Sequence, residues 1–129
     1  MAEGGLILVV DDEPAVLDIT AMTLEFAGFE ILRAEDGRAG ATLLEARGAE
    51  LSAVVLDTLC PSAEDAKHAL AALRRVRPDL PVLLCSGCFE DDAYHSLGLP
   101  PGGGDLNCRF LQKPYEKGAL EATVLELLR

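Results

Sequence analysis

The sequence predicts an α/β domain built on one parallel sheet, with helices covering both faces. Short apolar runs and longer amphipathic segments alternate five times between residues 6 and 128. The connections between them are short, and such alternation is typical of a doubly wound parallel sheet. With 129 residues, the chain has the length of a single domain with a substantial core.

Five apolar runs predict the strands of this sheet. In the run that ends at Asp57, Val54 and Val55 are β-branched, and no polar residue interrupts residues 53–56. This strand is therefore expected to be buried on both faces. The run that ends at Ala34 is less apolar than the others. The predicted strands cover residues 6–10, 29–34, 52–57, 81–85 and 109–112.

Five segments with apolar residues at helical spacing predict the helices. Pro14 suits a first helical turn, where its missing N–H costs nothing, and Gly28 supplies a stop. The fourth segment has a thin apolar stripe of Ala93 and Leu97. The predicted helices cover residues 14–27, 37–47, 64–76, 90–97 and 116–128. Three arginines are expected to form a solvated end of the third helix: Arg74, Arg75 and Arg77.

Charge and composition argue against several functions. The net charge is −11 and there is no Lys/Arg run, so direct nucleic-acid binding is not expected. No apolar run approaches the roughly 20 residues that span a bilayer, and the N-terminus lacks the features of a signal peptide. We therefore expect no membrane insertion and a cytoplasmic location. Residues 1–129 are interpreted as one domain, with residues 1–5 as a disordered N-terminal segment.

Reactive side chains follow four of the predicted strands, at the edge where the strands end. Asp11 and Asp12 follow the first strand, Asp57 ends the third, and Ser86 and Lys113 follow the fourth and fifth. In open α/β sheets this edge is where ligands bind. Three carboxylates in one site call for a cation such as Mg²⁺. Lys113 can hold a phosphoryl oxygen, and Asp57 can act as a nucleophile toward phosphorus.

Each of these residues also has a purely structural explanation. Asp11, Asp12 and Glu13 could cap the following helix, because acids are favoured at helix N-termini. Asp57 could be a turn residue, Ser86 an ordinary loop serine, and Lys113 an ordinary surface lysine. The agreement of all five positions with strand order and strand end favours a phosphoryl-transfer site.

Four motifs carry a family resemblance that covers the chain from residue 6 to the last helix. They are Val10-Asp11-Asp12-Glu13-Pro14, Val55-Leu56-Asp57 with Pro61 four residues on, Cys85-Ser86-Gly87, and Phe110-Leu111-Gln112-Lys113-Pro114. With these motifs the chain resembles the response-regulator receiver domains of two-component signalling. The resemblance implies a (βα)5 flavodoxin-like fold, a doubly wound parallel five-stranded sheet with strand order 2-1-3-4-5.

The resemblance also implies roles for the acidic residues. Asp57 would be the phosphorylation site and would accept a phosphoryl group from a phosphohistidine. Mg²⁺ would be held by Asp11, Asp12, Asp57 and the backbone carbonyl of Leu59.

The remaining implied roles concern binding of the phosphoryl group and the response to it. Ser86 and Lys113 would bind the phosphoryl oxygens. Phe110 would be an aromatic switch residue coupled to movement of Ser86, and the bond before Pro114 would be cis. The switched surface would be the one formed by helix 4, strand 5 and helix 5.

Partners follow from the same resemblance. The phosphoryl donor would be a sensor histidine kinase or a phosphotransfer domain, and homodimerisation is left open. An isolated domain of this kind would catalyse only its own phosphorylation and dephosphorylation. The wording of two motifs is similar to that of receivers in hybrid histidine kinases, so the parent chain is either such a kinase or a stand-alone regulator.

Two segments depart from the usual pattern of the family. The loop after Asp57 has Cys60 where Met is common and Asp65 where Gly is common. Asp tolerates a left-handed backbone, so this loop is expected to keep its shape. A Pro/Gly-rich segment, residues 98–108, replaces the usual short link before the fifth strand, so the fourth helix is expected to be short.

Two other functions are compatible with this strand and helix pattern. Cys85 and Cys88 form a C-x-x-C motif, which would suit a redox or metal-binding module. However, the pattern predicts that Cys85 is the inward-facing end of the fourth strand. All four cysteines are expected to be reduced thiols. An FMN-binding module would need a Ser/Thr/Gly-rich phosphate loop after the first strand. This chain has Asp11, Asp12 and Glu13 there, which would repel the FMN phosphate.

Overall fold

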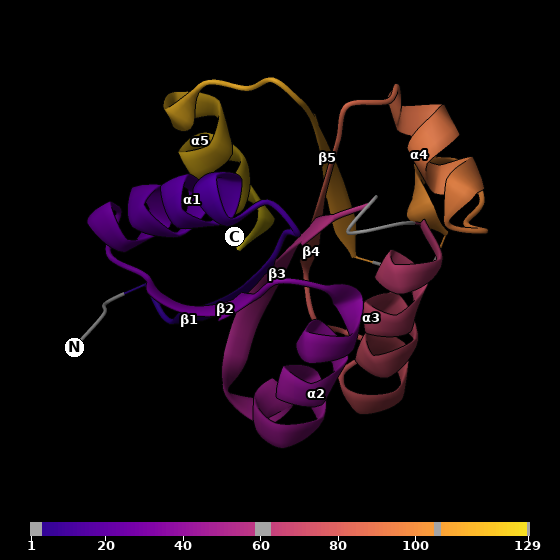
Figure 1. Cartoon of the computed structure of the whole chain (residues 1–129), viewed down its shortest axis with the longest axis horizontal. Coiled ribbons are helices and arrows are strands. Elements are labelled where there is room, and N and C mark those ends of the chain that lie inside the picture. The colour runs from indigo at the N-terminus through magenta and orange to yellow at the C-terminus, as the bar shows by residue number, and fades with distance from the viewer. Residues whose placement is uncertain (1–3, 59–62, 105–106, 129) are drawn as a thin grey trace.

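The protein folds as one five-stranded parallel sheet in a computed structural model, which describes residues 4–58, 63–104 and 107–128 (Figure 1). The strand order is β2-β1-β3-β4-β5, as predicted. Every pair of neighbouring strands is parallel, so all the carboxyl ends meet at one edge. The strands are β1 (Leu6–Val10), β2 (Glu30–Ala34), β3 (Leu51–Asp57), β4 (Val82–Ser86) and β5 (Cys108–Gln112).

Helices cover both faces of the sheet, with α1 and α5 on one face and α2, α3 and α4 on the other (Figure 1). The helices are α1 (Pro14–Phe26), α2 (Gly37–Arg47), α3 (Ala63–Val76), α4 (Glu90–Ser96) and α5 (Lys117–Leu127). Two 3-10 turns were not predicted: η1 (Gly48–Glu50) and η2 (Pro101–Gly103). The helix at 90–96 is short, as expected.

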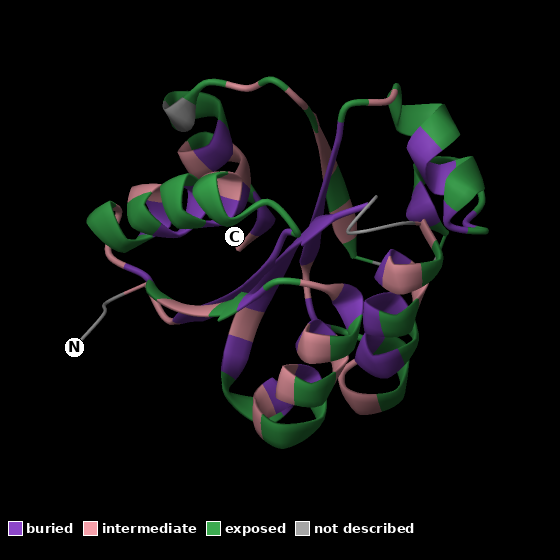
Figure 2. Ribbon diagram, in the orientation of Figure 1, coloured by how far each residue is buried: buried purple, intermediate pink, exposed green. Residues whose placement is uncertain are grey.

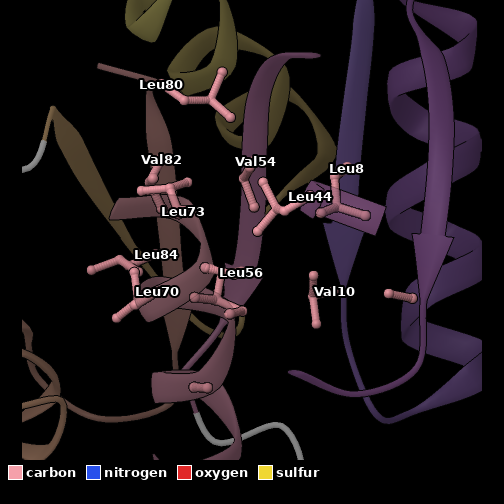
Figure 3. Packing of buried hydrophobic residues seen from close by; sticks show 14 of the residues in the cluster. Leu8, Val10, Leu44, Val54, Leu56, Leu70, Leu73, Leu80, Val82 and Leu84 are labelled. Atoms are coloured by element: carbon pink, nitrogen blue, oxygen red, sulfur yellow. The ribbon is translucent and has the colours of Figure 1, made fainter. Parts of the chain in front are cut away.

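Alternation along the strands divides the core into two apolar layers. Because successive side chains of a strand point to opposite faces, Leu56 and Leu84 lie on the α2–α3–α4 side, while Val55 and Leu83 lie on the α1–α5 side. Figure 3 shows the first layer, where sheet residues meet leucines from α2 and α3. The central strands β1, β3 and β4 are buried along almost their whole length, whereas the edge strands β2 and β5 are half-exposed (Figure 2).

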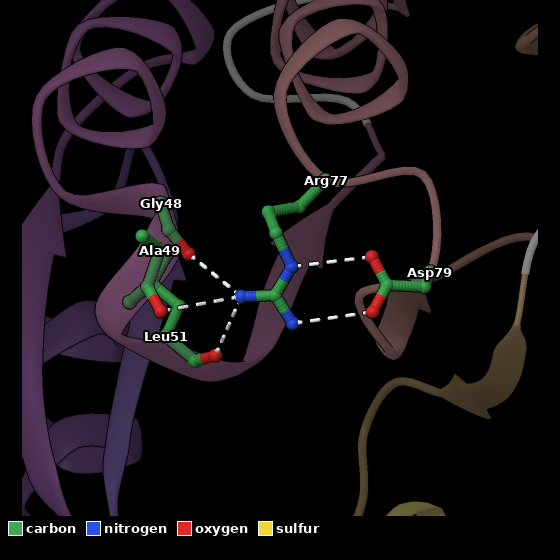
Figure 4. A network of polar contacts seen from close by, with 5 residues as sticks. All are labelled: Gly48, Ala49, Leu51, Arg77 and Asp79. Carbon is green, nitrogen blue, oxygen red and sulfur yellow. Dashed lines mark hydrogen bonds and ion pairs between the residues drawn. The ribbon is translucent and has the colours of Figure 1, made fainter.

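Arg77 is not part of a solvated helix end, so that prediction was wrong for this residue. Its guanidinium Nη1 donates to the carbonyl oxygens of Gly48, Ala49 and Leu51, at 3.0, 3.4 and 3.5 Å (Figure 4). Asp79 accepts from the other two nitrogens of the same group. A five-donor planar cation suits this arrangement, in which it ties the loop before β4 to the turn before β3.

Asp65 does not adopt the left-handed backbone that an aspartate tolerates. Asp65 lies in the first turn of α3, and no non-glycine residue in the described part of the chain has a positive φ. Its carboxylate instead accepts from the backbone N–H of Gly37, at the start of α2. Of residues 1–5, Gly4 donates to the Gly28 carbonyl, and residues 1–3 lie outside the described part of the chain.

Candidate functional site

Three carboxylates gather where β1 and β3 end. One oxygen from each of Asp11, Asp12 and Asp57 lies within 4.8 Å of the others. Asp11 and Asp57 are buried, at 4% and 8% exposure, and Asp12 is exposed. The strand order places β1 beside β3, so the acids at the carboxyl ends of these two buried strands meet at the same point. This is the arrangement that the sequence predicted for the carboxyl edge.

Lys113 joins the two buried carboxylates. Its Nζ lies 3.1 Å from Asp11 Oδ2 and 3.3 Å from Asp57 Oδ2, and its side chain is 22% exposed. Burial lowers the pKa of this ammonium group, but the neighbouring carboxylates of Asp57 and Asp11 raise it by more. The net result is a pKa above the ordinary value, so the site favours the charged form of Lys113.

The helix-capping explanation of the acids does not match the structure. The N-cap of α1 is Glu13, and its side chain makes no capping hydrogen bond. The carboxylate of Asp11 instead accepts from the backbone N–H of Glu13 at 3.0 Å, which holds it at the edge of the sheet. A true side-chain cap is seen at α2, where Asp36 accepts from the Ala39 N–H.

Ser86 is the last residue of β4 and is 1% exposed. Its Oγ accepts from the Cys88 N–H at 3.0 Å, and its carbonyl accepts from the Lys113 N–H at 2.7 Å. The second bond connects the ends of β4 and β5, so the positions of Ser86 and Lys113 depend on each other. The Lys113–Pro114 peptide bond is cis.

Phe110 lies on the α4 side of the sheet, in register with Leu84 of β4. It is half-buried, and its ring contacts that of Tyr94 from α4, with a centroid distance of 6.2 Å and an interplanar angle of 58°. Sequence reasoning missed Tyr94, because the stripe of α4 seemed to consist of Ala93 and Leu97 alone. Ala93, Tyr94 and Leu97 are all buried.

The C-x-x-C motif does not have the features of a redox pair. Cys85 is buried in the apolar layer under α1 and α5, and burial raises the pKa of its thiol to about 12. A reactive cysteine needs a lowered pKa and access to solvent. Cys85 and Cys88 are both free thiols.

A groove between α1 and α5 opens beside the site and was not predicted from the sequence. Its volume is about 370 Å³, and it is lined mainly by apolar side chains. Lys113 and Pro114 are among its lining residues. Ile19 and Thr23 of α1 also line a second hollow, together with the exposed Phe26. The predicted metal ligand Leu59 and the neighbouring Cys60 and Pro61 lie outside the described residues.

The donor set fits a hard divalent cation. Carboxylate oxygens are ligands that Mg²⁺ prefers in proteins. The site has three carboxylates and only the one ammonium group of Lys113 close to them, so an excess of negative charge is left for a cation to neutralise. Asp57 is one of these three acids and also contacts the Lys113 ammonium, at 3.3 Å. The arrangement can therefore bind a cation and an anionic group together.

Fold and site define a flavodoxin-like α/β domain with an acidic pocket at the carboxyl edge of its sheet. A family model described as the response regulator receiver domain matches residues 7–125. The chain therefore belongs to the family of response-regulator receiver domains of two-component signalling. Receiver domains generally bind Mg²⁺ at an acidic pocket and interact with histidine kinases or phosphotransfer partners.

Known proteins similar to this chain include regulators and a kinase. The probable transcriptional regulatory protein TcrX of Mycobacterium tuberculosis is 36% identical over 125 residues, which cover 94% of this chain and 47% of TcrX. The sensor kinase CckA of Brucella abortus is 32% identical over 122 residues, which cover 95% of this chain and 12% of CckA. A receiver protein from Sinorhizobium medicae has a similar crystal structure, with a TM-score of 0.80 at 28% identity, covering 98% of this chain and 95% of that one.

The chain thus spans about half or less of the curated relatives it matches. None of the helices in the described part of the chain has the length and apolar character needed to cross a membrane.

Proposed function

We propose that this domain is a Mg²⁺-dependent phosphoacceptor, in which Asp57 takes a phosphoryl group from a phosphohistidine. A carboxylate oxygen of Asp57 attacks phosphorus, the P–N bond to the imidazole breaks, and the imidazole leaves with the bonding electron pair and takes up a proton. The product is an aspartyl-phosphate. The single observation that carries this proposal is the Lys113 ammonium, which bridges the buried Asp57 and Asp11 inside the acidic cluster.

Lys113 and Ser86 act on the transferred group. In the unphosphorylated domain Lys113 neutralises Asp57, and after transfer its ammonium can follow the negative charge onto the phosphoryl oxygens. The Ser86 hydroxyl, which now accepts from Cys88, can turn to donate to another phosphoryl oxygen. Asp11, Asp12, Asp57 and the Leu59 carbonyl would hold Mg²⁺, which supplies charge neutralisation for the transferring oxygens.

The donor and the output follow from the family and from charge. We infer that the donor is a sensor histidine kinase or a phosphotransfer domain, because receiver domains interact with these partners. The parent protein is either a regulator, as TcrX is named, or a kinase such as CckA. With a net charge of −11, the receiver itself is not the part that would contact nucleic acid. Without an output domain, such a receiver could transmit its phosphorylation state by forming a homodimer.

Incubation with acetyl phosphate, followed by intact mass, tests the proposal. We expect one added phosphoryl group in the presence of Mg²⁺ and none after EDTA. Asp57→Asn should show no addition, whereas Asp18→Asn, which alters an exposed acid of α1, should behave like the wild type. A phosphoryl group that persists in Asp57→Asn, or that forms equally well in EDTA, would falsify the proposal.

A further inference from the structure

Thr58, which directly follows Asp57, carries a buried hydroxyl without a hydrogen-bond partner. The residue is 1% exposed. Among the described residues, its Oγ1 is the one fully buried side-chain oxygen or nitrogen that makes no hydrogen bond. A buried hydroxyl without a partner destabilises a fold, because it has given up its bonds to water. Such an atom beside a reactive carboxylate calls for a functional explanation.

The sheet register places Thr58 beside Ser86. The Thr58 N–H donates to the Cys85 carbonyl at 3.0 Å, which extends the ladder between β3 and β4 by one residue. Leu56 pairs with Leu84 in this ladder, and both lie in the apolar layer under α2, α3 and α4 (Figure 3). Because side chains alternate along a strand, the residues two positions further on share that side of the sheet. Thr58 and Ser86 are therefore neighbours across the two strands.

Ser86 has an oxygen that can accept from Thr58. It is 1% exposed, and its Oγ accepts from the Cys88 N–H at 3.0 Å. A serine hydroxyl can accept two hydrogen bonds and donate one, so the bond from Cys88 uses only one of these three. Neighbouring strands lie about 4.8 Å apart. Two hydroxyls at paired positions can therefore come within hydrogen-bond distance when one of the side chains turns.

A turn of Ser86 toward a phosphoryl group on Asp57 is also a turn toward Thr58. Asp57 and Thr58 are consecutive residues of the chain that lies beside β4. When the Ser86 hydroxyl donates to a phosphoryl oxygen, its Oγ moves toward this chain and can accept from Thr58. The result is a chain of hydrogen bonds from Thr58 through Ser86 to the phosphoryl group, in which each bond strengthens the next.

We propose that Thr58 is a positioning residue that acts through Ser86: its hydroxyl gains a partner, Ser86 Oγ, only when Ser86 donates to the phosphoryl group. The inference rests on the proposed function, because it needs Ser86 to bind a phosphoryl oxygen. The unpaired hydroxyl destabilises the unphosphorylated domain, and the new bond stabilises the phosphorylated one. Both effects favour the phosphorylated state, so Thr58 sets how strongly the site holds the phosphoryl group.

Beryllium fluoride, a tetrahedral mimic of a phosphoryl group on a carboxylate, tests the inference at equilibrium. Its affinity for the full chain is measured in Mg²⁺ by fluorine NMR. We expect Thr58→Val, which replaces the hydroxyl with a methyl group, to weaken binding about 5- to 30-fold. Thr58→Ser keeps the hydroxyl and should bind within about threefold of the wild type.

Two outcomes separate this inference from the proposed function. Equal affinity of Thr58→Val and the wild type overturns the inference and leaves the proposed function standing. A wild type that neither binds beryllium fluoride nor gains mass from acetyl phosphate overturns the proposed function, and the inference with it.

The stability of the unliganded domain should change in the opposite direction. Removing an unpaired buried hydroxyl should raise the urea midpoint of Thr58→Val above that of the wild type. The matched control is Thr20→Val, which removes a buried hydroxyl that lies 3.4 Å from Tyr115 Oη, so its midpoint should fall. A lower midpoint for Thr58→Val as well would show that its hydroxyl is already bonded before phosphorylation, and the inference would be wrong.

Ser86→Ala separates an action through Ser86 from a direct effect of Thr58. In this background the acceptor for Thr58 is gone, so adding Thr58→Val should change the affinity for beryllium fluoride by less than about twofold. A further loss as large as the one in the wild-type background would mean that Thr58 acts by another route, which overturns its role as a positioning residue for Ser86.

Discussion

The two sides of the sheet differ at its carboxyl edge. On the α1–α5 side, Lys113 holds two buried carboxylates, Asp11 and Asp57, through contacts of 3.1 and 3.3 Å. On the α4 side, the corresponding contact is between two aromatic rings, Phe110 and Tyr94, at a centroid distance of 6.2 Å. The contacts at the edge are therefore electrostatic on the α1–α5 side and apolar on the α4 side.

This difference separates chemistry from response. The carboxylates follow the two central strands β1 and β3, which are buried along nearly their whole length and cannot shift easily. Phe110 belongs to an edge strand and faces a seven-residue helix, so the α4 side can rearrange at lower cost. The bond from the Lys113 N–H to the Ser86 carbonyl, at 2.7 Å, joins the two sides through the backbone.

Removing the charge on the α1–α5 side should have the largest effect. We expect Lys113→Met to slow phosphorylation by acetyl phosphate about 10²- to 10³-fold, because a preorganised cation at the transferring oxygens is lost. Lys113→Arg keeps the positive charge but replaces the ammonium with a planar guanidinium. Its phosphorylation rate should therefore lie between those of the wild type and Lys113→Met. The initial rate of mass gain is the measurement.

Arg109→Met is the matched control for this prediction. Arg109 is an exposed cation four residues earlier, and its ion pair with Glu126, at 3.9 Å, is a surface contact of little energetic value. Its rate should equal that of the wild type. Equal slowing in both variants would mean that overall charge, and not the position of Lys113, controls the reaction.

The acidic side of this comparison could be predicted from the sequence because it depends on strand ends. An apolar run that stops at an acid fixes both the strand and the place of its carboxylate, so Asp11 and Asp57 could be assigned with the strand order. The observed strand bounds lie within one residue of the predicted ones. Ser86, for example, is the last residue of β4 and not the first after it.

The α4 side could not be predicted in the same way. Periodicity in a seven-residue helix is too short to identify its buried face, so Tyr94 was missed. Arg77 was also misjudged, because a long cationic side chain near a helix end is usually solvated. Only the folded chain shows that three carbonyl oxygens converge on it.

Away from the carboxyl edge, apolar packing on the two sides of the sheet should contribute equally to stability. A pair of core variants tests this. Leu84 and Leu83 are adjacent in β4, both fully buried, and point to the α4 side and the α1–α5 side respectively. Each change to Ala should lower the free energy of unfolding by about 2–3 kcal/mol, measured by urea titration. Leu125→Ala, at 48% exposure, should cost less than about 0.5 kcal/mol. A much smaller loss for Leu84→Ala would mean that the α4 side is loosely packed throughout, not only at its edge.

The smallest predicted effect concerns the thiol that lies beneath the charged edge. Burial raises the pKa of Cys85 from the ordinary 9.0 to about 12. A pKa that is higher in the folded state stabilises the fold fully below pH 9, and this stabilisation is lost as the pH rises toward 12. The raised pKa of Lys113 acts in the same direction above 10.5, its ordinary value. The free energy of unfolding should therefore fall by about 1 kcal/mol between pH 9 and pH 10.

Urea titrations at a series of alkaline pH values, on wild type, Cys85→Ala and Cys88→Ala, assign this loss. Cys85→Ala should flatten the fall between pH 9 and pH 10, because the buried thiol that binds a proton only in the folded state is gone. Cys88→Ala removes a thiol of the same motif that lies outside the core and should keep the wild-type slope. If Cys85→Ala keeps that slope too, the protons are bound by other groups. The loss of stability would then have to be assigned to Lys113 and Tyr115, which are partly buried and also have raised pKa values.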